Sequence, residues 1–243
     1  MRYLIELLLI LVCVKAYAAA FGTEQLTSQV PYQLIYSEQV YGRAKSKQLP
    51  MVLFFHGQHR DESYGLDVFD KLGVDDAGFP AIRLISFRAN WTQMGRYYWA
   101  NDQKLMESVV AGARELVRRY PTRGKPILMG FGFGGAVVYD LAAQYGDMFS
   151  AAFVVDGNIS GSFKEGLPGS GAKPVFHIYH ELYNADSTTG VPEIEKVRAF
   201  VANLKETHYE ADLHEIQGSN YMNFALSHAI SHDLEQQIFR SEL

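Results

Sequence analysis

Short, wholly apolar segments recur along this chain of 243 residues and constrain its fold more than any other feature. Residues 51–55, Met-Val-Leu-Phe-Phe, follow Pro50 and precede His56 and Gly57. An apolar run of this length between turn residues is typical of a strand that a parallel sheet buries on both faces. Comparable segments predict strands at residues 81–87, 127–129, 151–155 and 175–179, with a last strand at 210–216 and a weakly alternating edge strand at 32–36.

Helical periodicity fills the intervals between these segments. From residue 105 to residue 117, apolar side chains recur three and four positions apart, and charged residues occupy the other face. Residues 134–145 predict a helix that packs closely on the sheet because it is rich in glycine and alanine, and residues 192–207 and 224–240 predict two more. The alternation of strand and helix predicts an α/β fold, a doubly wound and mostly parallel sheet with helices on both faces.

Composition and charge narrow the function classes. With 48% hydrophobic and 20% charged residues, the chain can bury one large core, and we expect a single domain over residues 21–243. The net charge of -5 and the absence of a Lys/Arg cluster argue against nucleic acid as a partner. No motif predicts a cofactor.

The first twenty residues predict a secretory signal peptide. Arg2 precedes an apolar run at residues 7–14, and the small residues at 16–20 fit cleavage near Ala18 or Ala20. The run is shorter than the roughly 20 residues of a spanning helix, so we expect the chain to be exported, periplasmic or secreted, with membrane contact only before cleavage. Cys13, the only cysteine, follows Val12 and is not predicted to be lipidated; the mature chain then has no thiol for disulfide, metal or nucleophile chemistry.

Residues 127–135, Ile-Leu-Met-Gly-Phe-Gly-Phe-Gly-Gly, read as a nucleophile turn between a strand and a helix, with Gly132 at its centre. The chain also contains four short segments in this order: residues 52–57, Asn90-Trp91, Tyr120-Pro121 and the glycines of residues 130–135. From residue 51 to the end, this order resembles the α/β-hydrolase fold, and more narrowly the secreted esterases similar to polyhydroxybutyrate depolymerase and feruloyl esterase.

The resemblance implies three catalytic positions, and most of them are degenerate. The nucleophile position holds Gly132, which has no side chain. The histidine position holds Asn220, whose amide cannot act as a general base. The acid is expected after residues 175–179, where Tyr183 or Asn184 stands; Asp186 could substitute if the loop is two residues longer, and Glu181 is a poorer candidate.

The resemblance also implies a cleft at the carboxyl ends of the strands, where α/β sheets bind ligands. His56, Gly57 and Gln58 form the expected oxyanion loop, and Phe133 follows the turn. Trp91 begins an aromatic segment, residues 91–99, that serves either as a stacking surface for a small-molecule or protein ligand or as a lid over an apolar core. We favour the lid.

Other candidate groups are weaker. His228 and His232 lie four apart on the predicted last helix, but without a nearby third ligand we predict no metal site. Of His177 and His180, one is expected to pack and the other to face the pocket. His59, Asp61 and Glu62 are interpreted as a polar loop.

Three functional hypotheses follow. The first is an exported protein that has lost its nucleophile and base and serves as a binding or assembly module. The alternative is a carboxylic-ester hydrolase with a non-standard site, using Ser86 or Ser160, although neither is flanked by elbow glycines. The third is a component of an envelope or secretion assembly.

Overall fold

The computed structural model describes most of the chain from residue 23 onwards. The described residues are 23–26, 32–42, 48–74, 79–93, 96–99, 102–157, 159, 173–182, 193–217 and 223–240. The predicted signal peptide, residues 1–20, lies outside them. Within them, no helix has the length and apolar character needed to cross a membrane.

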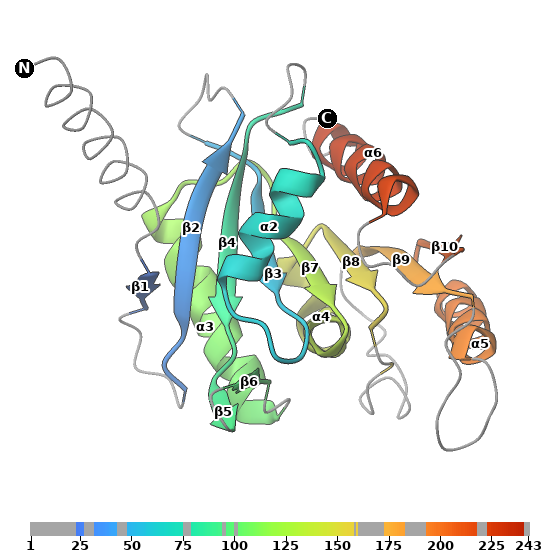
Figure 1. Cartoon of the computed structure of the whole chain (residues 1–243), viewed down its shortest axis with the longest axis horizontal. Coiled ribbons are helices and arrows are strands. Elements are labelled where there is room, and N and C mark those ends of the chain that lie inside the picture. Colours follow the sequence, from blue (N-terminus) through green and yellow to red (C-terminus); the bar gives the residue numbers. More distant parts are fainter. Residues whose placement is uncertain are drawn as a thin grey trace, which may run out of the picture.

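A sheet of eight strands forms the centre of the fold (Figure 1). From β4 onwards, the neighbouring strands are parallel, whereas β1 and β2 are antiparallel to their neighbours. The predicted fold class, a mostly parallel α/β sheet, is therefore confirmed. In spatial order the strands are β1 (Thr23–Gln25), β2 (Ile35–Tyr41), β4 (Ile82–Arg88), β3 (Met51–Phe55), β7 (Ile127–Phe131), β8 (Ala151–Val155), β9 (Val175–Glu181) and β10 (Ala211–Ile216).

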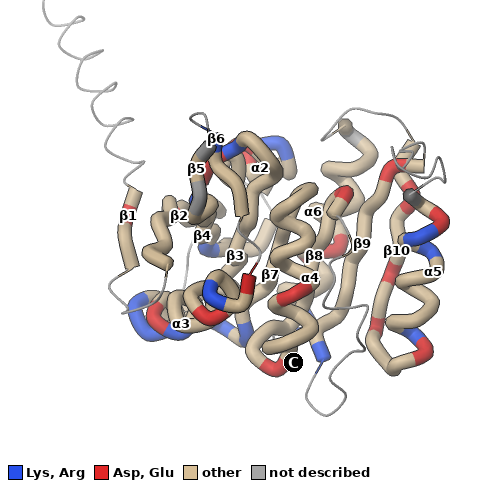
Figure 2. Tube along the Cα trace, turned by 90° about the horizontal axis from the view of Figure 1, so that it is seen from below, with Lys and Arg blue, Asp and Glu red and all other residues tan. Residues whose placement is uncertain are grey.

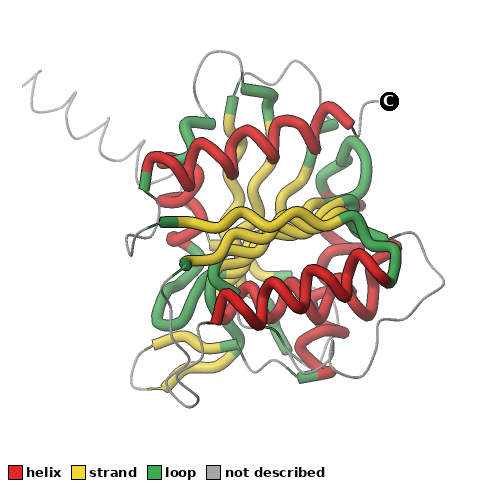
Figure 3. The backbone as a smooth tube through the Cα atoms, turned by 90° about the vertical axis from the view of Figure 1, so that its right-hand side faces the viewer, coloured by secondary structure: helices red, strands yellow, loops and turns green. Residues whose placement is uncertain are grey.

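Helices cover both faces of this sheet (Figure 3). One apolar core contains side chains of α3 (Gln103–Arg119), α4 (Phe133–Tyr145) and α5 (Glu193–Glu206). The core on the opposite face contains side chains of α2 (Ser63–Lys71) and α6 (Phe224–Arg240). Every residue of β3, β7 and β8 is buried, because these central strands are covered on both sides.

Local sequence explains where α3 begins and ends. The side chain of Asp102 accepts a hydrogen bond from the backbone N–H of Leu105 at 2.8 Å, which caps the first turn. Arg118 and Arg119 lie in the last turn, where positive charge is favourable, and Pro121 follows the C-cap Tyr120. Figure 2 shows basic and acidic positions mixed along α3 and α5 rather than segregated.

One local expectation was wrong, and one helix and one hairpin were not predicted. The strand placed at residues 32–36 is Ile35–Tyr41, and it is not an edge strand because β1 pairs with its outer side. The polar loop around residues 59–62 leads directly into α2, which the sequence analysis did not predict. The strands within the aromatic segment were not predicted either: β5 (Trp91–Gln93) and β6 (Arg96–Tyr98) pair as an antiparallel two-stranded sheet.

Candidate functional site

The turn at Gly132 joins β7 to α4 and has the sharp geometry expected of a nucleophile elbow. Its φ of 52° and ψ of -116° lie where glycine is tolerated far better than other residues. The N–H of Gly132 donates to the carbonyl of Val155 at 2.9 Å, and its own carbonyl accepts from Gly135 at 3.0 Å. The backbone N–H and carbonyl groups of residue 132 are thus both hydrogen-bonded, but the residue has no side chain that could take part in chemistry.

Glycines beside the turn let α4 approach the strands closely. A Cβ atom on Gly134 would lie 2.0 Å from the carbonyl oxygen of Phe55, at the end of β3. A Cβ on Gly130 would lie 2.4 Å from the carbonyl oxygen of Gly134 itself. Both contacts are with backbone, which cannot move aside as a flexible side chain can, so only glycine fits. The glycine pattern of the motif is therefore required by packing whether or not the turn is catalytic.

His56 is buried at the end of β3 and both of its ring nitrogens have partners. Nε2 accepts from the backbone N–H of Ala89 at 2.9 Å, so Nδ1 carries the proton and donates to the carbonyl of Gly57 at 2.7 Å. Burial lowers the pKa of His56 below its ordinary value, which favours this neutral form. The ring thus joins the ends of β3 and β4 and has no nitrogen available to act as a base.

The other predicted cleft residues can be placed individually. Gly57 and Phe133 follow the carboxyl ends of the adjacent strands β3 and β7, and therefore lie at the same edge of the sheet. Phe133 is 43% exposed; among the described residues, Phe239 is the other large apolar side chain with comparable exposure. Gln58 is exposed. Trp91 lies on β5, and its side chain is outside the described part of the structure.

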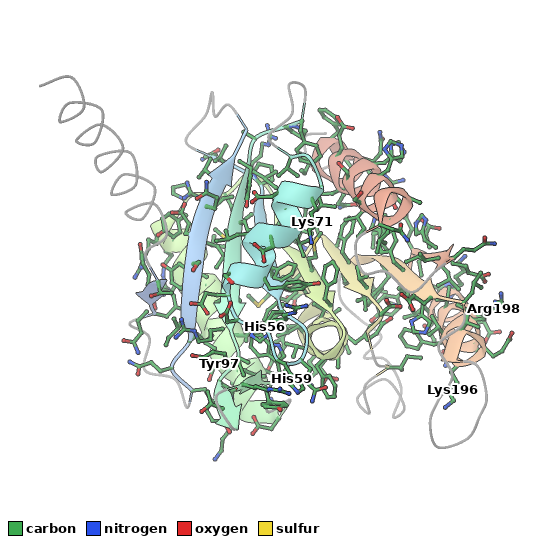
Figure 4. The ribbon with its side chains drawn as sticks, viewed as in Figure 1. His56, His59, Lys71, Tyr97, Lys196 and Arg198 are labelled. Carbon is green, nitrogen blue, oxygen red and sulfur yellow. The ribbon has the colours of Figure 1, made fainter. Side chains whose placement is uncertain are left out.

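The β5–β6 hairpin lies at this same end of the molecule. Figure 4 shows His56, His59 and Tyr97 there together. The Trp99 ring, next after β6, is buried 5.4 Å from the Phe55 ring and donates from Nε1 to the carbonyl of His56 at 2.8 Å. Trp99 is therefore part of the core at the end of β3, as the lid interpretation expects.

An ion pair joins the end of β4 to the start of α2. The guanidinium of Arg88, at the end of β4, donates from Nε to the buried carboxylate of Glu62 at 2.5 Å. The same guanidinium lies 5.1 Å from the centre of the Tyr97 ring. Glu62, interpreted from the sequence as an ordinary loop residue, thus joins α2 to β4, and Arg88 in turn contacts the hairpin through Tyr97.

A buried carboxylate and imidazole lie next to the turn, and the sequence analysis missed their pairing. Asp156 follows β8 directly and accepts from the backbone N–H of Glu181 at 2.9 Å. The Nδ1 atom of His180 lies 3.4 Å from Asp156 Oδ1, and these two side chains are only 4% and 5% exposed. The sequence signal for this pair is Asp156 itself, a polar residue at the carboxyl end of a buried strand. Adjacent parallel strands bring such ends together.

The candidate serines do not complete a nucleophilic site within the described residues. Ser86 is fully buried beneath α2, where a Cβ on Gly65 would lie only 2.4 Å from its hydroxyl oxygen. A substrate cannot reach this hydroxyl without removal of α2, so the prediction of Ser86 as nucleophile is wrong. Ser160, Asp186 and Asn220 lie outside the described residues, as do Tyr183 and Asn184.

The histidines are arranged differently from the predicted pairs. His228 and His232 are both exposed on α6. His177 and His180, three apart on β9, point to opposite faces of the sheet because side chains alternate along a strand. His177 lies with His214 of β10 and Asp233 of α6, a grouping that the sequence analysis did not find.

One surface hollow lies at the opposite end of β7 from Gly132. It has a volume of about 460 Å³ and is formed between the C-terminal half of α3 and the segment that precedes β7. Arg114, Arg118 and Lys125 contribute to its lining. Because it lies at the amino end of the strand, this hollow is separate from the predicted cleft.

No protein-family model matches the sequence, and no curated protein does. Solved structures define the class of fold, which is that of the α/β-hydrolases. A carboxylesterase from Mesorhizobium loti is similar over 87% of this chain and 98% of its own, with a TM-score of 0.63 and 15% identity. A carboxylesterase from Bacillus cereus is similar over 83% of this chain and 94% of its own, with a TM-score of 0.59 and 12% identity.

A protein of unknown function from Agrobacterium tumefaciens is similar over 82% of this chain and 95% of its own, with a TM-score of 0.61 and 17% identity. At such identities the likeness concerns the fold. The narrower resemblance to depolymerases and feruloyl esterases stays a prediction.

Proposed function

We propose that this chain is an exported protein of the α/β-hydrolase fold that does not hydrolyse and uses its scaffold for binding or assembly. The observation that carries the proposal is the turn at Gly132, whose backbone is that of an elbow and whose central residue has no side chain. An acyl-transfer mechanism needs an oxygen or sulfur nucleophile at that point. The complete burial of Ser86 removes one substitute for it.

The names of the structurally similar proteins do not decide the function of this chain. Several are carboxylesterases or esterases by name, so the fold is compatible with ester hydrolysis. Against that background, a glycine at the elbow and an asparagine at the expected base position are two independent losses. The binding face we propose is the carboxyl edge of the sheet, where α/β folds bind ligands and where Phe133 is exposed.

The test is an activity assay of the purified protein. We expect no hydrolysis of p-nitrophenyl acetate or butyrate above the buffer rate and no labelling by a fluorophosphonate probe. Labelling at any serine, or turnover that survives a second purification step, would refute the non-catalytic proposal.

The alternative function, a carboxylic-ester hydrolase with a non-standard site, is favoured by one observation. The buried Asp156–His180 pair lies beside the turn and has the chemistry of an oriented general base. In that case water rather than a serine would attack the ester, and His180→Ala would abolish the activity. Activity without fluorophosphonate labelling would support this alternative.

Export is proposed from the first twenty residues. The apolar run and the small residues that follow it fit signal-peptidase cleavage. Expression of residues 1–243 with a C-terminal tag in a Gram-negative host should give a periplasmic protein. Its mass should correspond to a mature chain that begins after Ala18 or Ala20. A cytoplasmic protein that keeps Met1 would contradict this.

A further inference from the structure

Two neighbouring strands and one helix bring two imidazoles and a carboxylate together away from the turn. In the parallel pair β9–β10, His177 lies opposite Asp212 and Tyr179 lies opposite His214. Residues two apart on a strand point to the same face, so these side chains all face α6, which packs on that side. Asp233 of α6 points back at them. The cluster thus joins β9, β10 and α6, which Figure 1 shows at one end of the sheet.

The distances within the cluster suit a shared ion. Asp233 Oδ2 lies 3.0 Å from His214 Nε2 and 3.9 Å from His177 Nδ1. The three ligand atoms lie within 4.8 Å of one another. Two ligands bound at about 2.1 Å to one zinc ion are at most about 4.2 Å apart, so small rotations of the rings would close the site. Two imidazoles and a carboxylate are a frequent ligand set for zinc and related ions.

A second, independent observation is the environment of the His177 ring. It is 7% exposed, its ring stacks on Phe153 at 4.5 Å, and both of its nitrogens are buried without a hydrogen bond to any described residue. Buried polar atoms in proteins nearly always have a partner. His214 Nε2, although close to Asp233, also makes no aligned hydrogen bond. A metal ion between the three groups would give His177 Nδ1 and His214 Nε2 a partner each.

The surroundings hold the ligands in position. The hydroxyl of Tyr179 donates to Asp233 Oδ2 at 2.6 Å, and its ring stacks on His214 at 4.6 Å. Ligands of metal sites are usually fixed by such outer contacts. Exposed Asp212 adds negative charge beside His177, while the cation of Arg240 is paired with Glu210 at 2.7 Å. The His214 side chain is 35% exposed and gives an ion access from solvent.

We propose that His177, His214 and Asp233 bind one divalent transition-metal ion of the zinc type and thereby fasten α6 to the last two strands. This inference does not depend on the proposed function, because the cluster contains no part of the turn at Gly132. Three protein ligands leave a further coordination position for water.

Cobalt(II) binding to the purified, chelator-treated protein tests the proposal. We expect one equivalent of cobalt to give the visible absorption bands of a four-coordinate site, zinc to displace it, and zinc but not magnesium to raise the melting temperature. His214→Ala and Asp233→Asn should weaken zinc binding by about 100-fold or more, and Tyr179→Phe by about 10- to 100-fold. His232→Ala removes an exposed imidazole next to Asp233 in the chain and should bind as the wild type does.

The proposal is overturned if the wild type gives no cobalt spectrum and no zinc-dependent rise in melting temperature. It is equally overturned if His214→Ala binds zinc as tightly as the wild type. Circular dichroism of each metal-free variant checks its fold. Should His177→Ala fail to fold, His214→Ala and Asp233→Asn still carry the test, because their side chains are 35% and 17% exposed and tolerate truncation better.

Discussion

The turn at Gly132 and the cluster at His177 are opposites. At the turn, the backbone has an unusual conformation and close packing, but position 132 carries no reactive group. At the cluster, the backbone is ordinary strand and helix, but two imidazoles and a carboxylate converge from three elements. The contrast teaches that the geometry of a site and its chemical groups are specified separately. Packing against β3 requires the glycines of the turn whatever chemical group stands at position 132.

The largest expected effect concerns the packing of the turn. Gly134→Ala would place a methyl group 2.0 Å from the carbonyl oxygen of Phe55, so we expect a loss of about 3 kcal/mol or more in the free energy of unfolding, or no folded protein. Urea unfolding measures this loss of stability. Gly57→Ala is the matched control: its Cβ would lie 3.4 Å from the carbonyl oxygen of Phe131, and it should cost less than about 1 kcal/mol. Equal stability of the two variants would show that α4 can move away from β3.

The second prediction concerns a hydroxyl introduced at the turn. Gly132→Ser should lower the free energy of unfolding by about 1–3 kcal/mol, because a side chain is strained at a φ of 52°. It should give no turnover of p-nitrophenyl acetate, because the predicted base position holds Asn220. The double variant that combines Gly132→Ser with Asn220→His is expected to show some turnover of p-nitrophenyl acetate.

A fast esterase from Gly132→Ser alone would contradict that expectation and would point to His180 as the base. His180→Ala in the same background then decides, since it should abolish the new activity. In that outcome the wild-type turn would lack only its nucleophile, and both regions would contain functional side chains.

Sequence predicted the backbone of this protein better than its side-chain clusters. The central strands were found because a run such as residues 51–55 has few stable solutions other than a buried strand. Helix α2 was missed because it is only nine residues long and contains Gly65, which is there to pack over Ser86. The glycines of the turn were visible as a motif because packing and conformation both require them.

The side-chain clusters could not be predicted in the same way. Asp156 meets His180 only through the register of β8 and β9, and Asp233 meets His214 only once α6 is placed on the sheet. The partners lie too far apart in the chain for any local period to relate them. The spacing of His228 and His232, which is local, suggested a pair that the structure leaves exposed.

A third prediction addresses the support of the cluster without metal. Tyr179→Phe removes the 2.6 Å hydrogen bond to Asp233 and leaves a partly buried carboxylate with one donor fewer. We expect a loss of about 1–2 kcal/mol in the free energy of unfolding of the chelator-treated protein. Tyr145→Phe, at the end of α4, removes only an exposed 3.3 Å contact with Gln103 and should change little. A neutral Tyr179→Phe would mean that the cluster is not held by this hydroxyl.

The last prediction is a dependence of stability on pH to which one buried histidine near each region contributes. Burial is the largest cause that lowers the pKa of His56 and of His177 below the ordinary 6.5. The unfolded chain therefore binds a proton at each histidine at a higher pH than the folded chain does. Stability is fully present above about pH 6.5 and is lost as the pH falls from there towards the folded pKa values, by at most about 1.4 kcal/mol per pH unit for each group.

Separating the two histidines compares the regions directly. Urea unfolding of the chelator-treated protein between pH 7.5 and 5 should show a reduced slope in His177→Phe, which replaces the ring stacked on Phe153 by another aromatic ring. The carboxylates of Asp233 and Asp212 act on His177 in the opposite direction, and those of Asp61 and Glu62 do so on His56. Because burial is the larger cause at both sites, stability should still fall with pH; a rise below pH 6.5 would show that the carboxylates dominate and that His177 is held as a cation.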